Sequence, residues 1–152
     1  CDDNIRRYRM ESLIIHSTLT ECDIDLGVES IALSHKGDED LMICSFQDVI
    51  KLDGTIHSAI EYNTKRIDNW IYKEDYERLR GKSRHVAYVG GVVNGFTNNT
   101  LNENQSESLK VYIKYMTLRH PGLEVLGYSN VSGYDSEGFN VNMFLKKSKI
   151  WV

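Results

Sequence analysis

The segment Ser12-Leu13-Ile14-Ile15-His16-Ser17 carries the strongest structural signal in the chain. Large apolar residues in succession, bounded by polar ones, are typical of a short buried strand, and His16 is expected at its C-terminal end. A second run of this kind is His85-Val86-Ala87-Tyr88-Val89. Gly90-Gly91 ends that run where the backbone must turn or approach another segment closely.

Two further signals predict more strands. The β-rich runs at residues 41–51 and 55–60 flank Leu52-Asp53-Gly54. An Asp-Gly pair between such runs favours a hairpin, because glycine adopts positive φ at little cost. An antiparallel pair of strands is therefore expected here. A final short strand is predicted at residues 124–128, followed by a loop rich in serine, glycine and asparagine.

One long helix is predicted with clear ends. Asn102 can cap its first turn with Gln105 in the reciprocal position, and the helix should end near His120, before Pro121-Gly122. Its buried stripe consists of four apolar residues at helical spacing: Leu109, Tyr112, Ile113 and Met116. A more modest helix is predicted at residues 26–36.

The remaining segments carry weaker signals. Residues 63–82 are rich in charged residues with aromatic residues between them, and this pattern predicts an irregular or partly helical segment. Residues 92–100 are predicted to form a loop. Strands that alternate with helices, together with one hairpin, predict a single α/β domain with a mixed central β-sheet flanked by helices. We assign this domain to residues 10–152, after a polar N-terminal segment at residues 1–9.

The composition argues against several classes of protein. The chain has 152 residues and a formal net charge of -4, and its basic residues are scattered apart from short clusters near the two ends, so nucleic-acid binding is not expected. The longest apolar runs are too short to cross a bilayer. The chain has three cysteines: Cys1, Cys22 and Cys44. Their odd number argues against a disulfide framework, and the lack of a Cys-X-X-Cys pair argues against a cysteine-rich zinc site.

The first residues, Cys1-Asp2-Asp3-Asn4, allow two interpretations. Bacterial lipoproteins are cleaved before a cysteine that then carries the lipid, so Cys1 is a possible lipid anchor. The alternative, which we favour, is that the sequence is a fragment that begins at this residue.

Short motifs occur along the chain in the order typical of one enzyme family. The segment around His16 is followed by Asp53-Gly54-Thr55-Ile56, by Ala87-Tyr88-Val89-Gly90-Gly91 and by a helix ending in His120-Pro121-Gly122. Val125-Leu126-Gly127-Tyr128 and Gly138-Phe139-Asn140-Val141 come next. In this series the chain resembles the zinc-dependent N-acetylmuramoyl-L-alanine amidases of the bacteriophage T7 lysozyme type, over most of residues 10–145. It is most similar to members from Bacteroidetes and their phages.

The resemblance implies a zinc site whose ligands have changed. An active member holds Zn²⁺ with two histidines and one cysteine or aspartate, and the fourth position holds the water that attacks the amide. His16 stands at the first ligand position, but Tyr128 replaces the second histidine and Ser136 replaces the third ligand. Phe46 matches the catalytic tyrosine of the family, and Tyr134 matches a lysine found in some members.

These exchanges predict that the zinc ion and the amidase activity have been lost, so that no cofactor is expected. A serine hydroxyl is a much poorer zinc ligand than a thiolate, and the Tyr128 phenol would have to ionise first. Phe46 cannot donate a proton or a hydrogen bond to a developing oxyanion. His16 is then expected to be a satisfied polar residue at a strand end, bonded to Tyr128 or Ser136.

Other residues offer weaker routes to chemistry. The best substitute metal site combines His16 with Asp135 and His57, but Asp135 and Glu137 lie in a glycine-rich loop, where acidic side chains are usually solvated. A cysteine nucleophile is the other alternative. A strand cysteine such as Cys44 is more often a small buried side chain, and no oriented base is apparent, so we do not favour it.

Three functions remain open. We favour an inactive amidase-like domain that binds peptidoglycan or a muropeptide in a vestigial groove; non-catalytic peptidoglycan recognition proteins likewise have a serine at the position of Ser136. The second is a structural or protein-interaction component of a phage particle or bacterial envelope complex. The third is an active amidase with altered ligands. An open polar cleft around His16 favours binding, and a cleft filled by Phe46 and Tyr128 favours structural reuse. The cell envelope or a phage particle is the expected location.

Overall fold

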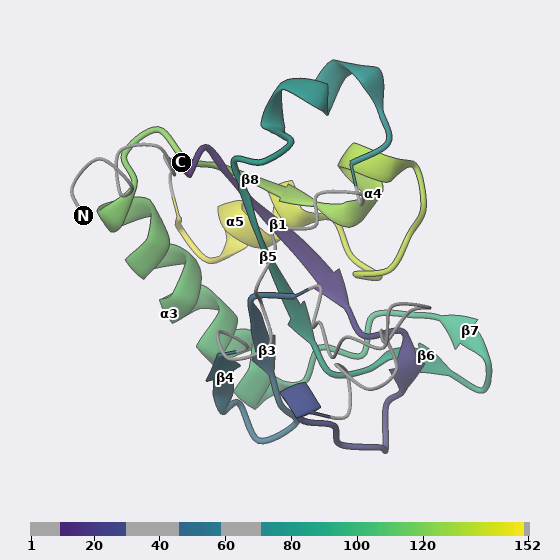
Figure 1. Ribbon diagram of the computed structural model, residues 1–152. Helices are drawn as coiled ribbons and strands as arrows, with labels where there is room; N and C mark the ends of the chain where they lie inside the picture. The colour runs from purple at the N-terminus through teal and green to yellow at the C-terminus, as the bar shows by residue number, and fades with distance from the viewer. Residues whose placement is uncertain (1–9, 30–45, 59–70, 151–152) are drawn as a thin grey trace.

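A five-stranded sheet with the strand order β4-β3-β5-β1-β8 forms the centre of the domain (Figure 1). The computed structural model describes residues 10–29, 46–58 and 71–150. The strands are β1 (Ser12–Ser17), β3 (Asp48–Ile50), β4 (Ile56–Ser58), β5 (Ser83–Tyr88) and β8 (Glu124–Gly127). They pair in parallel except for β4, which is antiparallel to β3. The predicted mixed sheet and the hairpin around Asp53-Gly54 are therefore confirmed.

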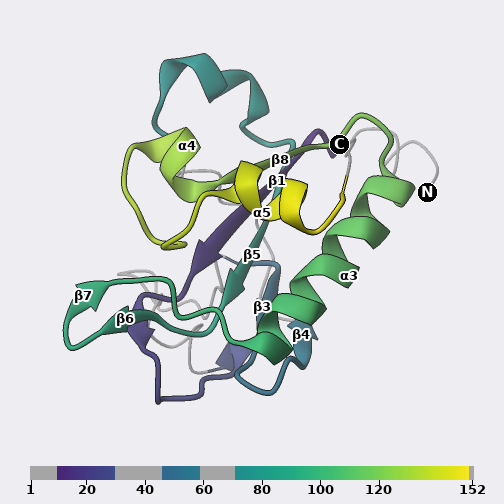
Figure 2. The ribbon, with the colours of Figure 1, turned by 180° about the vertical axis from the view of Figure 1, so that it is seen from behind.

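Helices cover the two faces of this sheet. Figure 2, which shows the molecule from behind, has α3 (Glu103–Arg119) and α5 (Val141–Lys147) in front of the strands. The 3₁₀ helix η2 (Glu74–Leu79) and the short helix α4 (Tyr128–Ser132) contribute side chains to the core on the opposite face. The α/β class predicted from the sequence is confirmed.

The alternation along β1 decides which face each of its side chains meets. Leu13 and Ile15 belong to the larger core, together with side chains of α3 and α5. Ile14 instead packs with Leu79 and Val131, at the end of η2 and in α4. Because successive strand side chains point to opposite faces, His16 shares the face of Ile14 and is directed away from α3.

Helix α3 has the ends that were predicted. The Asn102 side chain accepts a hydrogen bond from the Gln105 N–H at 2.8 Å, and Gln105 Oε1 accepts one from the Asn102 N–H at 3.1 Å. The helix ends at Arg119, with His120 as its C-cap, and the four predicted stripe residues are buried. Gln105 is buried as well, and its Nε2 donates to the carbonyl of Val89 at 2.9 Å. This bond ties the start of α3 to the end of β5.

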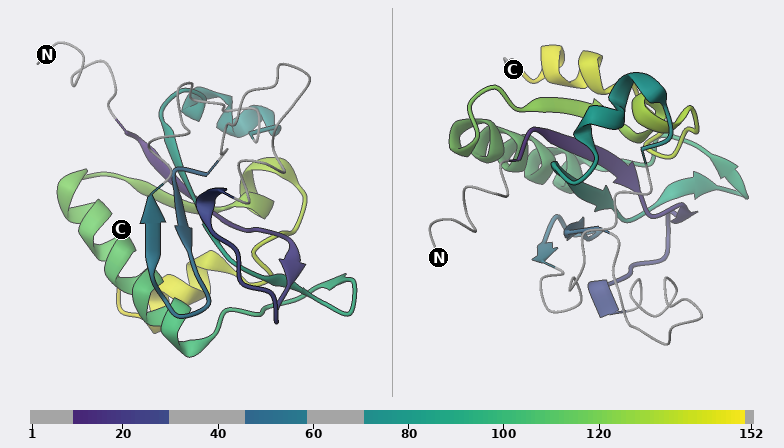
Figure 3. Two further views of the ribbon diagram at one scale, coloured as in Figure 1. Left: turned by 60° about the horizontal axis from the view of Figure 1, so that its bottom comes forward. Right: turned by 45° about the horizontal axis from the view of Figure 1, so that its top comes forward.

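The loop predicted at residues 92–100 is wrong, because a hairpin occupies part of it. Strands β6 (Gly91–Val93) and β7 (Phe96–Thr97) pair antiparallel, and β2 (Thr20–Glu21) pairs with β6 in parallel. Asn94 and Gly95 connect β6 and β7 with φ values of 50° and 84°. An Asn-Gly pair with positive φ at both residues is a strong hairpin signal that the prediction overlooked. Figure 3 shows this hairpin projecting to one side of the central sheet.

The segment after β8 also differs from the prediction. The strand ends at Gly127, and Tyr128 is the first residue of α4 rather than the last residue of the strand. The Asn130 side chain accepts a hydrogen bond from the Gly127 N–H at 2.8 Å, which fixes the turn into the helix. At α5 the arrangement is reversed, because Asn140 is the N-cap residue and its side chain accepts from the Met143 N–H at 3.0 Å.

Some predictions fall wholly or partly outside the described residues. They concern the polar segment at residues 1–9 with Cys1, most of the helix predicted at residues 26–36, the first part of the strand at residues 41–51, and Cys44. The predicted excursion at residues 63–82 is described from Ile71 onward, and there it contains η2, as a partly helical segment should. In the described part of the chain, no helix is both long enough and apolar enough to span a membrane.

Candidate functional site

His16 lies near the C-terminal end of β1 and is buried, with 1% of its surface exposed. Its Nε2 lies 2.9 Å from Nδ1 of His85, in a hydrogen bond in which one ring donates and the other accepts. The register of β1 and β5 explains this contact, because Ile14 is opposite His85 and His16 is opposite Ala87. His16 and His85 therefore lie on the same face of the sheet, on the adjacent strands β1 and β5. The sequence prediction had given His85 no role.

Aromatic rings surround His16 on its other sides. The Tyr128 ring stacks on it with a centroid separation of 4.8 Å, and the Phe46 ring lies 5.0 Å away at a tilt of 57°. Phe46 and Tyr128 are themselves buried. The structure therefore brings together His16, Phe46 and Tyr128, and the rings occupy the space beside the imidazole. Two of the side chains named for a filled cleft, Phe46 and Tyr128, therefore contact His16.

Tyr128 is held in a state that disfavours metal binding. Burial raises the pKa of its phenol; a hydrogen bond with Ser132 lowers the pKa by less, and the nearby Tyr72 and Tyr134 side chains each raise it by smaller amounts. The neutral phenol is therefore the stable form at physiological pH. A phenol must lose its proton before it can serve as an anionic ligand of zinc.

Ser136 lies beside the end of β1, next to Ser17. The Ser17 hydroxyl donates to the Ser136 carbonyl at 2.5 Å, and the Ser17 N–H donates to the Ser136 hydroxyl at 3.4 Å. These bonds attach the segment after α4 to the end of β1. The sequence predicts that His16 contacts Tyr128 or Ser136; in the structure Tyr128 stacks on His16, and Ser136 forms bonds to Ser17.

Glu137 anchors the same segment, and the prediction that its side chain is solvated is wrong. Its carboxylate is fully buried and accepts hydrogen bonds from the Ser129 hydroxyl at 3.0 Å and from the N–H groups of Ser129 and Ser136. A Cβ at Gly127 would clash with this carboxylate, so glycine is required there for the close approach. Burial raises the pKa of Glu137, while the hydrogen bonds lower it by less.

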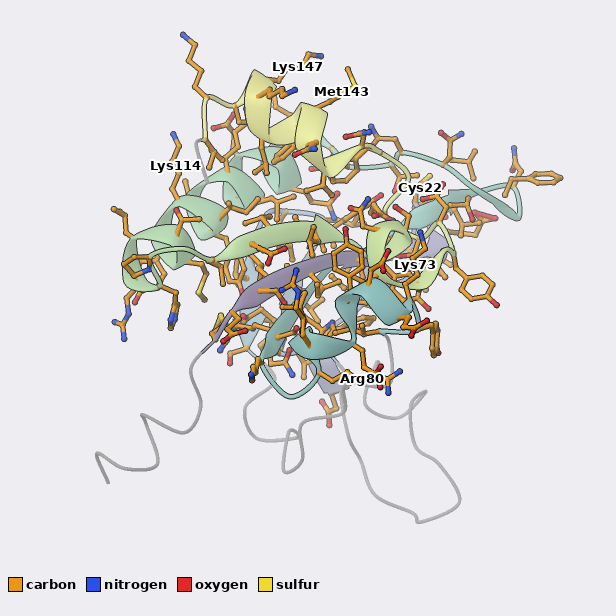
Figure 4. The ribbon with its side chains drawn as sticks, turned by 90° about the horizontal axis from the view of Figure 1, so that it is seen from above. Cys22, Lys73, Arg80, Lys114, Met143 and Lys147 are labelled. Carbon is orange, nitrogen blue, oxygen red and sulfur yellow. The ribbon has the colours of Figure 1, made fainter. Side chains whose placement is uncertain are left out.

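Tyr134 is exposed, unlike the buried rings of Phe46 and Tyr128. It is 65% exposed and contacts Tyr72, which is 54% exposed, in an edge-to-face arrangement with a centroid separation of 6.1 Å. Lys73, the residue after Tyr72, is labelled in Figure 4, where it lies away from helix α5 with its labelled residues Met143 and Lys147. Tyr72 is one of the interleaved aromatic residues of the segment at residues 63–82.

The substitute metal site is not assembled. His57 lies exposed on β4, which is separated from β1 by β3 and β5, so the two backbones are roughly 14 Å apart at about 4.8 Å per strand. Asp135 is exposed and accepts a hydrogen bond from the Gly138 N–H at 3.0 Å. Across residues 10–29, 46–58 and 71–150, no three His, Cys, Asp or Glu side chains form a group that could hold a metal ion.

The side chains at the three family positions do not fit a zinc ion either. Zinc sites in proteins are built from imidazole, thiolate or carboxylate groups. Here His16 is engaged with His85, Tyr128 is a buried phenol with a raised pKa, and Ser136 is a hydroxyl bonded to the strand end. Only one of the three donors is of a kind that zinc prefers.

Comparison with solved structures reveals the fold. The N-acetylmuramoyl-L-alanine amidase LysC from Clostridium intestinale URNW superposes with a TM-score of 0.69 at 14% identity, over 95% of this chain and 88% of that one. The Ph2119 endolysin of a Thermus scotoductus MAT2119 bacteriophage gives a TM-score of 0.63 at 14% identity, over 91% and 84%. The chain has the amidase fold. The sequence matches no family model and no curated protein sequence.

The domain is also similar to peptidoglycan recognition proteins. The complex of tracheal cytotoxin with the peptidoglycan recognition proteins LCa and LCx gives a TM-score of 0.63 at 14% identity, over 96% of this chain and 86% of that one. The fold predicted from the resemblance is confirmed by these structures. At this level of identity they establish the fold of the amidase-like domain, and its chemistry depends on its own residues.

Proposed function

We propose that the chain is a catalytically inactive amidase-like domain that binds peptidoglycan or a fragment of it. We infer the lack of activity from the side chains at the three positions that bind zinc in the active amidases. His16 is hydrogen-bonded to His85, Tyr128 stacks on His16, and Ser136 is bonded to Ser17. These side chains are engaged with the protein itself and do not offer three ligands to a metal.

The described side chains around His16 do not supply the groups that amide hydrolysis needs. Zinc acts in such enzymes by lowering the pKa of a bound water and by polarising the amide carbonyl. Without a set of three ligands, no residue described around His16 replaces that function. Phe46 provides a ring but no hydroxyl to stabilise a developing oxyanion. The resident zinc of the amidases is therefore, in this proposal, absent from the working protein.

Peptidoglycan binding is supported by the kind of proteins that share the fold. They include amidases, an endolysin and a recognition protein complex with tracheal cytotoxin. Binding needs the outer surface of the site and makes no demand on a catalytic metal. A ligand of this domain would meet the surface beside α4, because rings occupy the space next to His16.

A second candidate is a structural or protein-interaction role in a phage particle or a bacterial envelope complex. The observation that favours it is the packing of Phe46 and Tyr128 against His16, which is the arrangement expected if the groove has been filled. In this case the domain would contribute its fold and its outer surface to an assembly. The cell envelope or a phage particle is the location proposed in either case.

Sedimentation with purified peptidoglycan sacculi distinguishes these functions. We expect the full chain to pellet with the sacculi, with no new free L-alanine amino groups on the stem peptides and no stoichiometric zinc by elemental analysis. Protein that stays in the supernatant would exclude binding and leave the structural role. Stoichiometric zinc together with new L-alanine amino groups would instead identify an active amidase with altered ligands, and would overturn the proposal.

A further inference from the structure

Two exposed tyrosines stand beside the candidate site. Tyr72 is 54% exposed and Tyr134 is 65% exposed, and their rings meet at 89° with a centroid separation of 6.1 Å. They come from two segments that are far apart in the sequence, one leading into η2 and one following α4. Although the two rings are in contact, large parts of both remain exposed to solvent.

The backbone under this pair is well anchored. The N–H groups of Tyr72 and Lys73 both donate to the carbonyl of Val131 in α4, at 2.9 and 2.8 Å. The Tyr134 N–H donates to the Ser132 hydroxyl at 3.0 Å. The buried Ile71 accepts two bonds from the Arg80 guanidinium at its carbonyl, at 3.1 and 2.7 Å. The rings are thus presented on ordered supports, so binding a ligand there would cost little ordering of the backbone.

The position of the pair connects it to the vestigial site. Tyr128, the first residue of α4, stacks on His16, and its carbonyl accepts a bond from the Ser132 hydroxyl at 2.7 Å. The same Ser132 hydroxyl accepts the bond from Tyr134. One short helix therefore joins the buried ring beside His16 to the exposed rings on the surface.

The size and polarity of the patch indicate what it binds. A stable protein interface needs about 800 Å² from each partner, whereas the pair offers parts of two rings. Its neighbours Lys73, Glu74 and Asp75 are exposed charged residues, which do not suit an extended apolar partner. A sugar ring matches such a patch, because its C–H face packs on an aromatic ring while its hydroxyl and acetamido groups meet polar side chains. The tyrosine hydroxyls and the Lys73 ammonium supply those polar groups.

We propose that Tyr72 and Tyr134 form a platform for an N-acetylhexosamine ring of the peptidoglycan glycan strand. This inference rests on the proposed function, because it names the part of peptidoglycan that the domain recognises. The sugar packs against the tyrosine rings, and Lys73, whose side chain passes over Gly133, borders the same surface. The platform is a recognition surface with no catalytic role.

The test measures the affinity of the full chain for tetra-N-acetylchitotetraose by calorimetry, with sacculus sedimentation in parallel. Tyr72→Ala and Tyr134→Ala remove one ring each, and Tyr134→Phe keeps the ring without its hydroxyl. Tyr115→Ala is the matched control, since Tyr115 is 52% exposed on α3. Truncation of an aromatic anchor should weaken binding by about tenfold, and Tyr134→Phe should weaken it by less, because it keeps the ring and loses only the hydroxyl. Tyr115→Ala should stay within about twofold of the unaltered chain.

Each outcome bears on a different claim. Loss of affinity in both alanine variants, with the tyrosine control unchanged, supports the platform. If the chain pellets with sacculi but does not bind chitotetraose, or binds a sugar-free stem peptide in its place, the platform is excluded and the proposed function stands. Unchanged affinity in both alanine variants also excludes the platform. Failure of the unaltered chain to pellet with sacculi would exclude the proposed function, and this inference with it.

Discussion

The face of the central sheet under α3 holds the larger apolar core, whereas the opposite face combines rings and polar groups around His16. On the first face, Leu13 and Ile15 pack with α3 residues such as Leu109 and Ile113 in one continuous core. On the second, His16 is held by a bond to His85 and by ring contacts with Phe46 and Tyr128. The larger apolar cluster of the described residues therefore lies under α3, and we expect its side chains to contribute more to stability than those around His16.

The largest effect is expected on the α3 face. Replacing Ile113 with alanine removes a fully buried side chain, and should lower the free energy of unfolding by about 2–5 kcal/mol. Val111, two residues away and 65% exposed, is the control, and its replacement by alanine should change the stability by less than about 0.5 kcal/mol. Urea denaturation measures both. Equal effects of the two variants would contradict the assignment of the core to this face.

A smaller effect is expected for the histidine pair on the other face. His16→Leu leaves His85 without this hydrogen bond and should cost about 1–3 kcal/mol, as should His85→Leu. The double variant should cost less than the sum, because neither polar group then lacks its partner. Urea denaturation of the four proteins completes the double-mutant cycle. Strictly additive losses would indicate that the bond contributes nothing to stability.

The smallest effect concerns the pH dependence contributed by Glu137. Burial raises its pKa above the ordinary value of 4.5 in the folded protein, so folding favours the protonated form. Its stabilising contribution is then fully present below pH 4.5 and is lost as the pH rises through the raised pKa of the folded state. Relative to Glu137→Gln, the unaltered chain should therefore lose stability over this range. Unfolding free energies measured for both proteins at several pH values give this difference.

A pH-independent difference between the two proteins would contradict the raised pKa of Glu137. An increase in the relative stability of the unaltered chain with rising pH would have the opposite sign, and would mean that the hydrogen bonds from Ser129 and Ser136 outweigh burial.

The parts of the fold that were predictable are those that local rules determine. The apolar run in β1, the Asp53-Gly54 hairpin and the capping box of Asn102 with Gln105 each have a signal within a few residues, and each is found in the structure. The hairpin at Asn94-Gly95 had such a signal too, and was missed because its strands are short. Helix α4 has five residues, too few for a periodic pattern to be recognised.

The candidate site was predictable only in its residue types. The resemblance to amidases selected His16, Phe46, Tyr128, Tyr134 and Ser136, but their contacts depend on register and packing. The bond between His16 and His85 follows from the alignment of β1 with β5, which no local pattern specifies. The burial of Glu137 likewise depends on the close approach to Gly127, ten residues earlier in the chain. Long-range contacts of this kind decide whether a polar side chain is a ligand or a structural anchor.

In the proposed function the domain binds peptidoglycan without cleaving it. The decisive experiment is sedimentation of the full chain with sacculi in the presence of added zinc, with the pellet analysed for protein and the digest for free L-alanine amino groups on the stem peptides. We expect protein in the pellet and no new L-alanine amino groups. Zinc-dependent formation of these amino groups, or protein that remains entirely in the supernatant, would contradict the proposed function.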